Sequence, residues 1–297
     1  MHSTFYMTNL VTDPYSSCKE AVSQLKSRVV FEFTGLPAVE QKSSDRLIYL
    51  QFSPCRFNMP AGTYNIKDST IDLIELKPAK GDTIDAIIHL THHTRYSIKE
   101  VPGIPSRVYL YVDRSPLIPL FKNKTVHLDP LCNPRAISPT SLKEEIPTLD
   151  ISKNLYQLLK LMQCNATITR DKPISFAERM KKISKLPPGI LISIGTTIDD
   201  PKISGFKVFY YPPSEDSLNL AKTLHSAMKE KLPLNSLGIH AANIKELSYG
   251  NPGVLVEVGC IKNRVDEGHL RDVDYKQKVA QALYNGLKRY LEITPQG

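Results

Sequence analysis

Glu257 is the residue best suited by type and position to take part in chemistry, because its carboxyl group lies inside an apolar segment. Val254, Leu255, Val256 and Val258 surround it, and such a β-branched run is typical of a strand buried on both faces. An unpaired carboxylate in those surroundings costs free energy unless it has a partner or binds a proton. We therefore expect Glu257 to have a charged partner, a raised pKa or a catalytic role.

Histidine and cysteine, which commonly bind metals, do not form local sites in this sequence. His92 and His93 are adjacent, and adjacent residues of a strand point to opposite faces, so joint binding of one ion is not expected. The five cysteines are odd in number and lack CxxC spacing, which indicates neither a disulfide framework nor a thiolate zinc cluster. We expect most of them to be small buried hydrophobic side chains. They are Cys18, Cys55, Cys132, Cys164 and Cys260.

The composition indicates a globular protein of one large or two ordinary domains. The 297 residues are 41% hydrophobic and 23% charged. The net charge of +8 favours anionic surroundings such as a cell wall polymer or a membrane face. No arginine-rich or aromatic-interleaved cluster indicates a nucleic acid partner. The sequence predicts no transmembrane segment, and its first residues lack the layout of a signal peptide.

Short alternating runs dominate the first half of the chain and predict a small all-β sandwich domain at residues 26–114. Gly, Pro, Ser and Asp residues separate these runs. We expect residues 1–25 to form an N-terminal segment outside this domain. The predicted strands are residues 28–33, 46–52, 72–78, 83–92 and 106–113.

The second half alternates strands and helices after a proline-containing linker at residues 115–123. This alternation predicts an α/β domain at residues 124–297, in which helices flank a largely parallel sheet. Its functional site is expected beyond the carboxyl ends of the strands. The predicted strands are 124–130, 166–171, 189–195, 205–211 and 254–259, and the predicted helices are 149–162, 175–184, 218–231 and 275–291.

Several short motifs of the second half occur in an order and spacing that resemble one known family. They are Asp129-Pro130, Glu144, Thr169-Arg170-Asp171, Arg179, Ser193-Ile194, and Glu257 with Gly259, Asn263, Asp266 and Glu267. From Lys124 to Leu291 the chain resembles the zinc-dependent N-acetylmuramoyl-L-alanine amidases of the Amidase_3 family. The resemblance implies that Arg170 and Arg179 fix a turn and a helix to their neighbours.

The resemblance also implies a zinc site, and it shows where this chain departs from the family. Glu144 stands at the position of a zinc ligand, and Glu257 stands at the position of the glutamate that assists the zinc-bound water. Cys132 replaces one ligand histidine, and Gly195 replaces another, so that ligand position is lost. Hydrolytic zinc sites use three protein ligands and a water. Because Gly195 has no side chain, at most two of the three family ligand positions could bind zinc in this chain. A remodelled site of Cys132, Glu144 and His240 remains an alternative.

Two further hypotheses concern residues near the expected site. His127 lies two residues before Asp129, so it should face the same side of its strand and be packed or paired. Cys132 could act as a nucleophile, although no histidine base stands at a supported position. Without a metal, Glu257 is expected to pair with a lysine or arginine, or to contact a ligand directly.

The first domain resembles an AMIN domain, a β-sandwich module that localises amidases to the cell envelope. The matching features are Arg28-Val29-Val30, Arg46-Leu47 and the run from Arg107 to Val112. The resemblance implies that this domain also brings the chain to the cell wall.

Together these features predict a cell-envelope homologue of the amidases that has lost its catalytic zinc. Such a protein would be a peptidoglycan-binding or regulatory module, with peptidoglycan fragments or an active amidase as its partner. One alternative is an active zinc-dependent amidase with a remodelled site. Another is a protein-interaction scaffold that does not bind the cell wall.

Overall fold

The computed structural model describes residues 4–13, 25–198, 200–250 and 252–294. The chain forms two compact units, residues 1–117 and 118–297. Within the described part of the chain, no helix combines the length and the apolar character needed to cross a bilayer.

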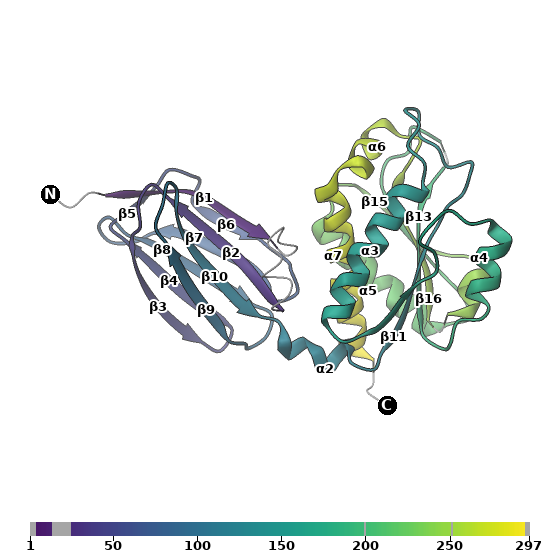
Figure 1. Cartoon of the computed structure of the whole chain (residues 1–297), viewed down its shortest axis with the longest axis horizontal. Helices are drawn as coiled ribbons and strands as arrows, with labels where there is room; N and C mark the ends of the chain where they lie inside the picture. Colours follow the sequence, from purple (N-terminus) through teal and green to yellow (C-terminus); the bar gives the residue numbers. More distant parts are fainter. Residues whose placement is uncertain (1–3, 14–24, 199, 251, 295–297) are drawn as a thin grey trace. The chain divides into compact units, whose positions relative to one another are not determined.

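The first unit is a sandwich of two five-stranded sheets (Figure 1). One sheet contains, in spatial order, β5 (Cys55–Phe57), β1 (Phe5–Asp13), β2 (Lys26–Phe33), β10 (Ser106–Asp113) and β9 (Tyr96–Val101). The other contains β3 (Ala38–Ser44), β4 (Leu47–Ser53), β8 (Ile84–Leu90), β7 (Ile71–Pro78) and β6 (Gly62–Asn65). The predicted all-β domain is therefore confirmed.

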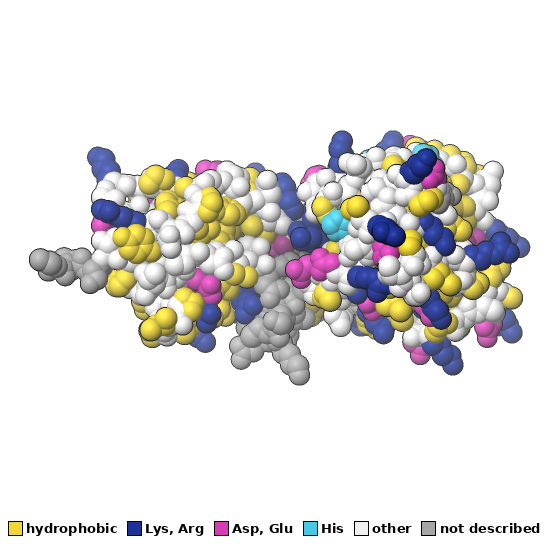
Figure 2. Space-filling model, turned by 90° about the horizontal axis from the view of Figure 1, so that it is seen from above, with side chains coloured by type: hydrophobic (Ala, Val, Ile, Leu, Met, Phe, Trp, Pro, Cys, Tyr) yellow, Lys and Arg dark blue, Asp and Glu magenta, His cyan; other side chains and the backbone are white. Residues whose placement is uncertain are grey.

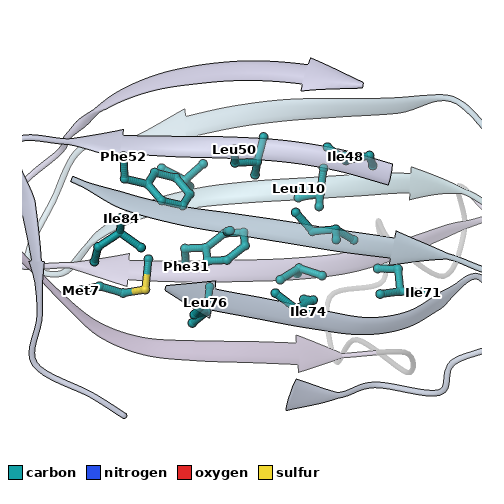
Figure 3. Packing of buried hydrophobic residues seen from close by; sticks show 14 of the residues in the cluster. Met7, Phe31, Ile48, Leu50, Phe52, Ile71, Ile74, Leu76, Ile84 and Leu110 are labelled. Atoms are coloured by element: carbon teal, nitrogen blue, oxygen red, sulfur yellow. The ribbon is translucent and has the colours of Figure 1, made fainter. Parts of the chain in front are cut away.

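The two sheets of this unit pack through the buried side chains on their facing sides. Every second residue of β8 and β10 is buried, because successive side chains of a strand point to opposite faces. Phe31 of one sheet and Phe52 of the other have ring centroids 5.1 Å apart, and Figure 3 shows both among the packed side chains of the core. The inward faces of both sheets thus form one hydrophobic core.

The start of the sandwich differs from the predicted boundary at residue 26. Residues 5–13 form β1, which pairs with β2 on one side and β5 on the other. Met7 is fully buried in the core, and this burial makes β1 part of the sheet. Residues 1–3 and 14–24 of the predicted N-terminal segment lie outside the described residues.

The linker predicted at residues 115–123 is largely helical. It contains the 3-10 helix η1 (Ser115–Leu117) and the helix α2 (Ile118–Phe121). The Phe121 ring is fully buried and stacks on Tyr284 of helix α7 (Val273–Ile293), with centroids 5.0 Å apart. The second part of the linker therefore packs within the α/β unit.

The second unit contains a six-stranded mixed sheet. Its spatial order is β12 (Asn165–Ile168), β11 (Thr125–Pro130), β13 (Ile190–Thr197), β16 (Gly253–Cys260), β14 (Phe206–Tyr210) and β15 (Ser236–Ala241). The first four strands are parallel, but β14 pairs with β16 in antiparallel fashion and β15 runs with β14. The predicted largely parallel sheet needs this correction, because no helix separates β13 from β14 and the chain reverses between them.

Helices cover the two faces of this sheet unequally. Helix α3 (Glu145–Leu161), α5 (Glu215–Lys231) and α7 pack together on one face. Helix α4 (Phe176–Ile183) lies on the other, as Figure 1 shows. The 3-10 helix η2 (Lys245–Tyr249) contacts α4. Helix α6 (Arg264–Arg271) follows β16. β15 and α6 were not predicted, because both are short and contain a glycine, and neither has a clear periodicity.

The parallel strands place four loops at one edge of the sheet, at the top of the α/β unit in Figure 1. These loops follow β11, β12, β13 and β16, whose carboxyl ends lie together. We call this the carboxyl edge. It is where parallel sheets usually bind ligands.

Two helical glycines test how closely the helices of this unit pack. A Cβ atom at Gly286 of α7 would lie 2.6 Å from the Leu224 Cα atom of α5, whereas one at Gly268 of α6 would meet nothing within 4 Å. Gly286→Ala should lower the free energy of unfolding by about 1–3 kcal/mol, because backbone atoms cannot move aside cheaply. Gly268→Ala should raise it by up to about 1 kcal/mol through helix propensity. Urea unfolding of the full chain measures both, and equal effects would contradict the close helix contact.

Candidate functional site

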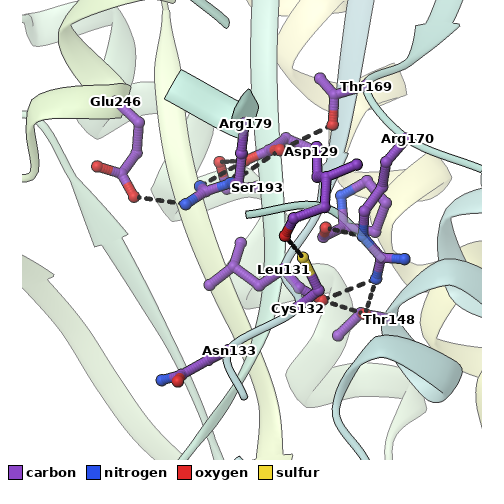
Figure 4. Close-up of polar contacts among 12 residues, drawn as sticks. Asp129, Leu131, Cys132, Asn133, Thr148, Thr169, Arg170, Arg179, Ser193 and Glu246 are labelled. Carbon is purple, nitrogen blue, oxygen red and sulfur yellow. Dashed lines mark hydrogen bonds and ion pairs between the residues drawn. The ribbon is translucent and has the colours of Figure 1, made fainter. Parts of the chain in front are cut away.

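Asp129 at the end of β11 is the buried anchor of the carboxyl edge. Its carboxylate is fully buried and accepts hydrogen bonds from Thr169 Oγ1 at 2.8 Å and Ser193 Oγ at 2.9 Å. Arg179 of α4 donates to the same carboxylate through Nε and, at 2.6 Å, through Nη2 (Figure 4). Arg179 Nη1 also pairs with Glu246 of η2 at 3.1 Å. One carboxylate therefore joins β11, β13, α4 and the end of β12.

Arg170 holds the loop that follows β11. Its Nε donates to the carbonyl of Pro130 at 2.7 Å, and its Nη2 donates to the carbonyl of Leu131 at 2.8 Å. Nη2 also reaches the Glu145 carbonyl and Thr148 Oγ1 at the start of α3. Burial lowers the pKa of Arg170. The predicted structural roles of Arg170 and Arg179 are thus confirmed.

The Glu144 carboxylate, just before α3, is bonded by the protein itself. It is buried, and Oε2 accepts from the backbone N–H of Asn133 at 2.8 Å. Oε1 accepts from the backbone N–H of Thr196 at 2.8 Å and from its hydroxyl at 3.0 Å. Burial raises the pKa of Glu144, and these hydrogen bonds counter part of that rise. Glu144 therefore ties the loop after β11 to β13.

Leu131 occupies the space in front of Gly195. A Cβ atom added at Gly195 would lie 2.8 Å from Leu131 Cδ2 and 3.5 Å from Glu144 Oε1. The Leu131 backbone N–H is held at 2.8 Å by the carbonyl of Ile194 on β13. A side chain at position 195 would thus point towards Glu144, and a leucine methyl group now fills its path.

Cys132 lies on the same loop but has a different partner. Its thiol donates to the carbonyl of Ile174, ahead of α4, with a sulfur to oxygen distance of 3.2 Å. The side chain is half-buried. Figure 4 shows the sulfur directed to this carbonyl, beside the Asp129 and Arg170 networks.

Glu257 forms an ion pair with Lys207, at 3.2 Å between Oε2 and Nζ. The two residues lie opposite each other on β16 and β14, and Gly195 is the partner of Glu257 on β13. Both side chains are mostly buried, with Lys207 16% and Glu257 17% exposed. The predicted pairing of Glu257 with a lysine or arginine is therefore confirmed.

The histidines considered for the site lie elsewhere. His240 is exposed on edge strand β15, where its ring packs on Phe209 at 5.5 Å and Nε2 lies 2.9 Å from the Leu237 carbonyl. Three strand spacings, roughly 14 Å, separate β15 from β13. His127 is buried, with its nitrogens bonded to Thr167 Oγ1 and the Pro187 carbonyl. It is packed and paired, as predicted.

Residues 4–13, 25–198, 200–250 and 252–294 contain no group of three His, Cys, Asp or Glu side chains close enough to share a metal ion. Cys132 bonds towards α4, Glu144 bonds towards β13, and the His240 ring lies tilted against Phe209. The structure thus does not bring the three together. Leu131 and Lys207 also belong to this site, although neither was predicted from the sequence. The signals were available: an apolar side chain directly before Cys132, and a cation in the predicted strand 205–211.

Solved structures define the class of the α/β unit. It resembles an N-acetylmuramoyl-L-alanine amidase from Clostridium difficile 630, with a TM-score of 0.54 and 23% identity over 58% of this chain and 98% of that chain. It also resembles the CwlD amidase from Clostridioides difficile, solved in complex with the GerS lipoprotein, with a TM-score of 0.53 and 24% identity over 58% of this chain and all of that chain. The unit thus has the fold of these amidases.

The sequence comparison identifies the family itself. Residues 132–289, more than half of the chain, match Amidase_3, described as N-acetylmuramoyl-L-alanine amidase. The chain therefore belongs to the Amidase_3 family, as its motifs predicted. A relative, the probable cell wall amidase LytH of Staphylococcus epidermidis, is 29% identical over 212 residues, 68% of this chain and 70% of that protein. The Amidase_3 match, residues 132–289, does not include the β sandwich, whose resemblance to an AMIN domain stays a prediction.

Removal of the Glu144 carboxylate tests whether it is a structural tie. Glu144→Ala should lower the free energy of unfolding by about 1–3 kcal/mol, because the backbone N–H groups of Asn133 and Thr196 lose their buried acceptor. Urea unfolding with and without a zinc chelator measures this loss. The neighbouring Glu145→Ala is the control and should change stability by less than about 0.5 kcal/mol. A loss that appears only when zinc is supplied would contradict the structural role.

A double-mutant cycle tests the packing of Leu131 against position 195. Gly195→His should destabilise the protein by about 1–3 kcal/mol, because the new side chain meets the Leu131 methyl group. In Leu131→Ala/Gly195→His the loss should be smaller than the sum of the single losses by about 1 kcal/mol or more. Strictly additive losses would show that the two positions do not compete for one space.

Proposed function

We propose that this chain is a non-catalytic member of the Amidase_3 family that acts as a peptidoglycan-binding or regulatory module in the cell envelope. The observation that carries the proposal is the arrangement of Glu144, Leu131 and Gly195. The carboxylate at the ligand position is bonded to backbone N–H groups. The neighbouring ligand position has no side chain, and Leu131 fills its space.

These residues do not fit a catalytic zinc ion. Such a site needs three convergent protein ligands and one open position for water. In the part of the chain that the structure describes, no three His, Cys, Asp or Glu side chains converge. Both oxygens of Glu144 already accept hydrogen bonds. The Cys132 thiol is directed to a backbone carbonyl. We therefore derive no hydrolytic step for this chain.

The retained Glu257 is consistent with this proposal. In a zinc amidase its carboxylate would assist a metal-bound water, but here the Lys207 ammonium lies 3.2 Å away. The pair compensates two charges at a mostly buried position, where an isolated charge would be costly. Glu257 then stabilises the sheet next to the carboxyl edge.

Peptidoglycan is the proposed ligand because the relatives of this chain are cell wall amidases. The β sandwich, with its predicted AMIN-like character, would add a second contact to the wall. A shallow pocket of about 270 Å³ lies on the outer face of its second sheet, lined by Tyr49, Gln51, Asp85 and neighbouring residues. A tyrosine ring beside amide and carboxylate groups suits a polar ligand. An active amidase is the proposed alternative partner at the wall.

Metal content and hydrolysis test the proposal together. Full-length protein purified with added zinc should contain far less than one zinc per chain, release no stem peptide from peptidoglycan, and be retained on purified sacculi. The matched control is Leu131→Gly/Cys132→His/Gly195→His, which restores the ligand set that the family resemblance implies and should bind about one zinc per chain. Stoichiometric zinc in the unmodified protein, together with stem peptide release, would overturn the proposal.

A further inference from the structure

Exposed hydrophobic side chains of the α/β unit gather at the carboxyl edge. Large apolar side chains there are exposed by between 36% for Ile137 and 68% for Phe176. They extend from the four loops that follow the parallel strands or from the residues just beyond those loops. We call this set the apolar rim. It consists of Ile137, Phe176, Ile198, Ile203 and Val265.

Hydrogen bonds fix the loops of the apolar rim to one another. Lys262 Nζ donates to the Ile137 carbonyl at 2.7 Å, and Asn263 Nδ2 donates to the Pro201 carbonyl at 2.8 Å. Asp266 accepts from the Ser204 hydroxyl at 2.5 Å and from the backbone N–H of Gly205. Ile137, Ile203 and Val265 thus project from one rigid group of loops. The Cys132 bond to the Ile174 carbonyl joins the loop before Phe176 to the same group.

Lysine and arginine side chains surround the apolar rim. The exposed cations there are Arg135, Lys143, Lys172, Lys202 and Arg264. Asp171 and Asp200 are exposed acids of the same loops, whereas Asp266 and Glu267 are buried and bonded within the protein. Asp199 lies outside the described residues. Figure 2 looks onto this end of the α/β unit and shows Lys and Arg side chains spread between hydrophobic ones.

We propose that the apolar rim docks the α/β unit on an anionic phospholipid bilayer. Apolar side chains that enter the interface, ringed by cations that meet anionic headgroups, are the chemistry by which proteins bind such a surface. The core of a protein-binding interface is instead contiguous and depleted in lysine. The isolated apolar side chains of this rim, separated by cations, fit a bilayer better. This inference goes beyond the proposed function, which concerns the cell wall.

Co-sedimentation of the full chain with vesicles tests the electrostatic part of this inference. Binding is expected to vesicles of phosphatidylcholine mixed with phosphatidylglycerol, and much less to phosphatidylcholine alone. Lys202→Glu/Arg264→Glu should weaken binding by about 25-fold or more, because each cation near an anionic surface contributes about fivefold. The control Lys122→Glu/Lys160→Glu makes the same charge change at exposed positions near the amino ends of the parallel strands and should leave binding within about threefold.

A second pair of variants tests insertion of the apolar side chains. Ile198→Ser/Val265→Ser should weaken vesicle binding about tenfold or more, because the two aliphatic side chains that would enter the bilayer interface are replaced by polar ones. The control Ile293→Ser changes a residue at the end of α7 that is about as exposed as Val265, and it should have no effect. Circular dichroism confirms that each variant is folded.

Three results would overturn the bilayer inference. They are no binding of the unmodified chain to anionic vesicles, equal losses in rim and control variants, and loss of sacculus binding in the rim variants without any vesicle binding. Sacculus retention and zinc content are measured separately on the same variants. The bilayer inference and the proposed function can therefore fail independently of each other.

Discussion

The α/β unit depends on one buried ion pair, between Asp129 and Arg179. A fully buried carboxylate is tolerated only when charged or polar donors surround it, and here Thr169, Ser193 and Arg179 supply them. These donors come from β13, α4 and the end of β12, so the pair decides where each of them lies. Its extension to Glu246 joins η2 to α4. The loops of the carboxyl edge follow from this arrangement.

The neighbouring Glu144 carboxylate is also buried and also needs partners. Hydrogen bonds from N–H donors stabilise the charged form of such a carboxylate. In this chain the donors are backbone groups of the loop after β11 and of β13. Glu144 therefore ties this loop to β13 through hydrogen bonds. Leu131 and Gly195 complement it, since one supplies the volume that the other lacks.

The elements of the fold that could be predicted are those with a clear hydrophobic periodicity in their own sequence. Strands such as 28–33 and 106–113, and helices such as 218–231, were predicted because their periodicity is strong, and they occur close to those bounds. β15 and α6 were missed because their sequences are short, contain a glycine and lack a clear periodicity. The antiparallel direction of β14 was missed because strand pairing is a long-range property that periodicity does not encode.

The candidate site also has some features that the sequence predicts and others that only the fold reveals. The prediction that Gly195 stands at a zinc ligand position came from the family motifs alone. The cationic partner of Glu257 could be predicted as a type, because a buried acid requires one. Its identity as Lys207 required the register of β14 against β16. The separation of His240 from the other candidates likewise required the strand order.

The family, the two-part organisation and the glycine at position 195 could be recognised from the residues alone, because motifs and periodicity are local. The fold was needed to show that Leu131 fills the space in front of Gly195, that backbone N–H groups bind Glu144 and that Lys207 pairs with Glu257. Those facts join residues distant in the chain, and packing and strand register bring them together. The apolar rim likewise could not be predicted from the sequence, since its residues come from separate loops that the folded sheet places side by side.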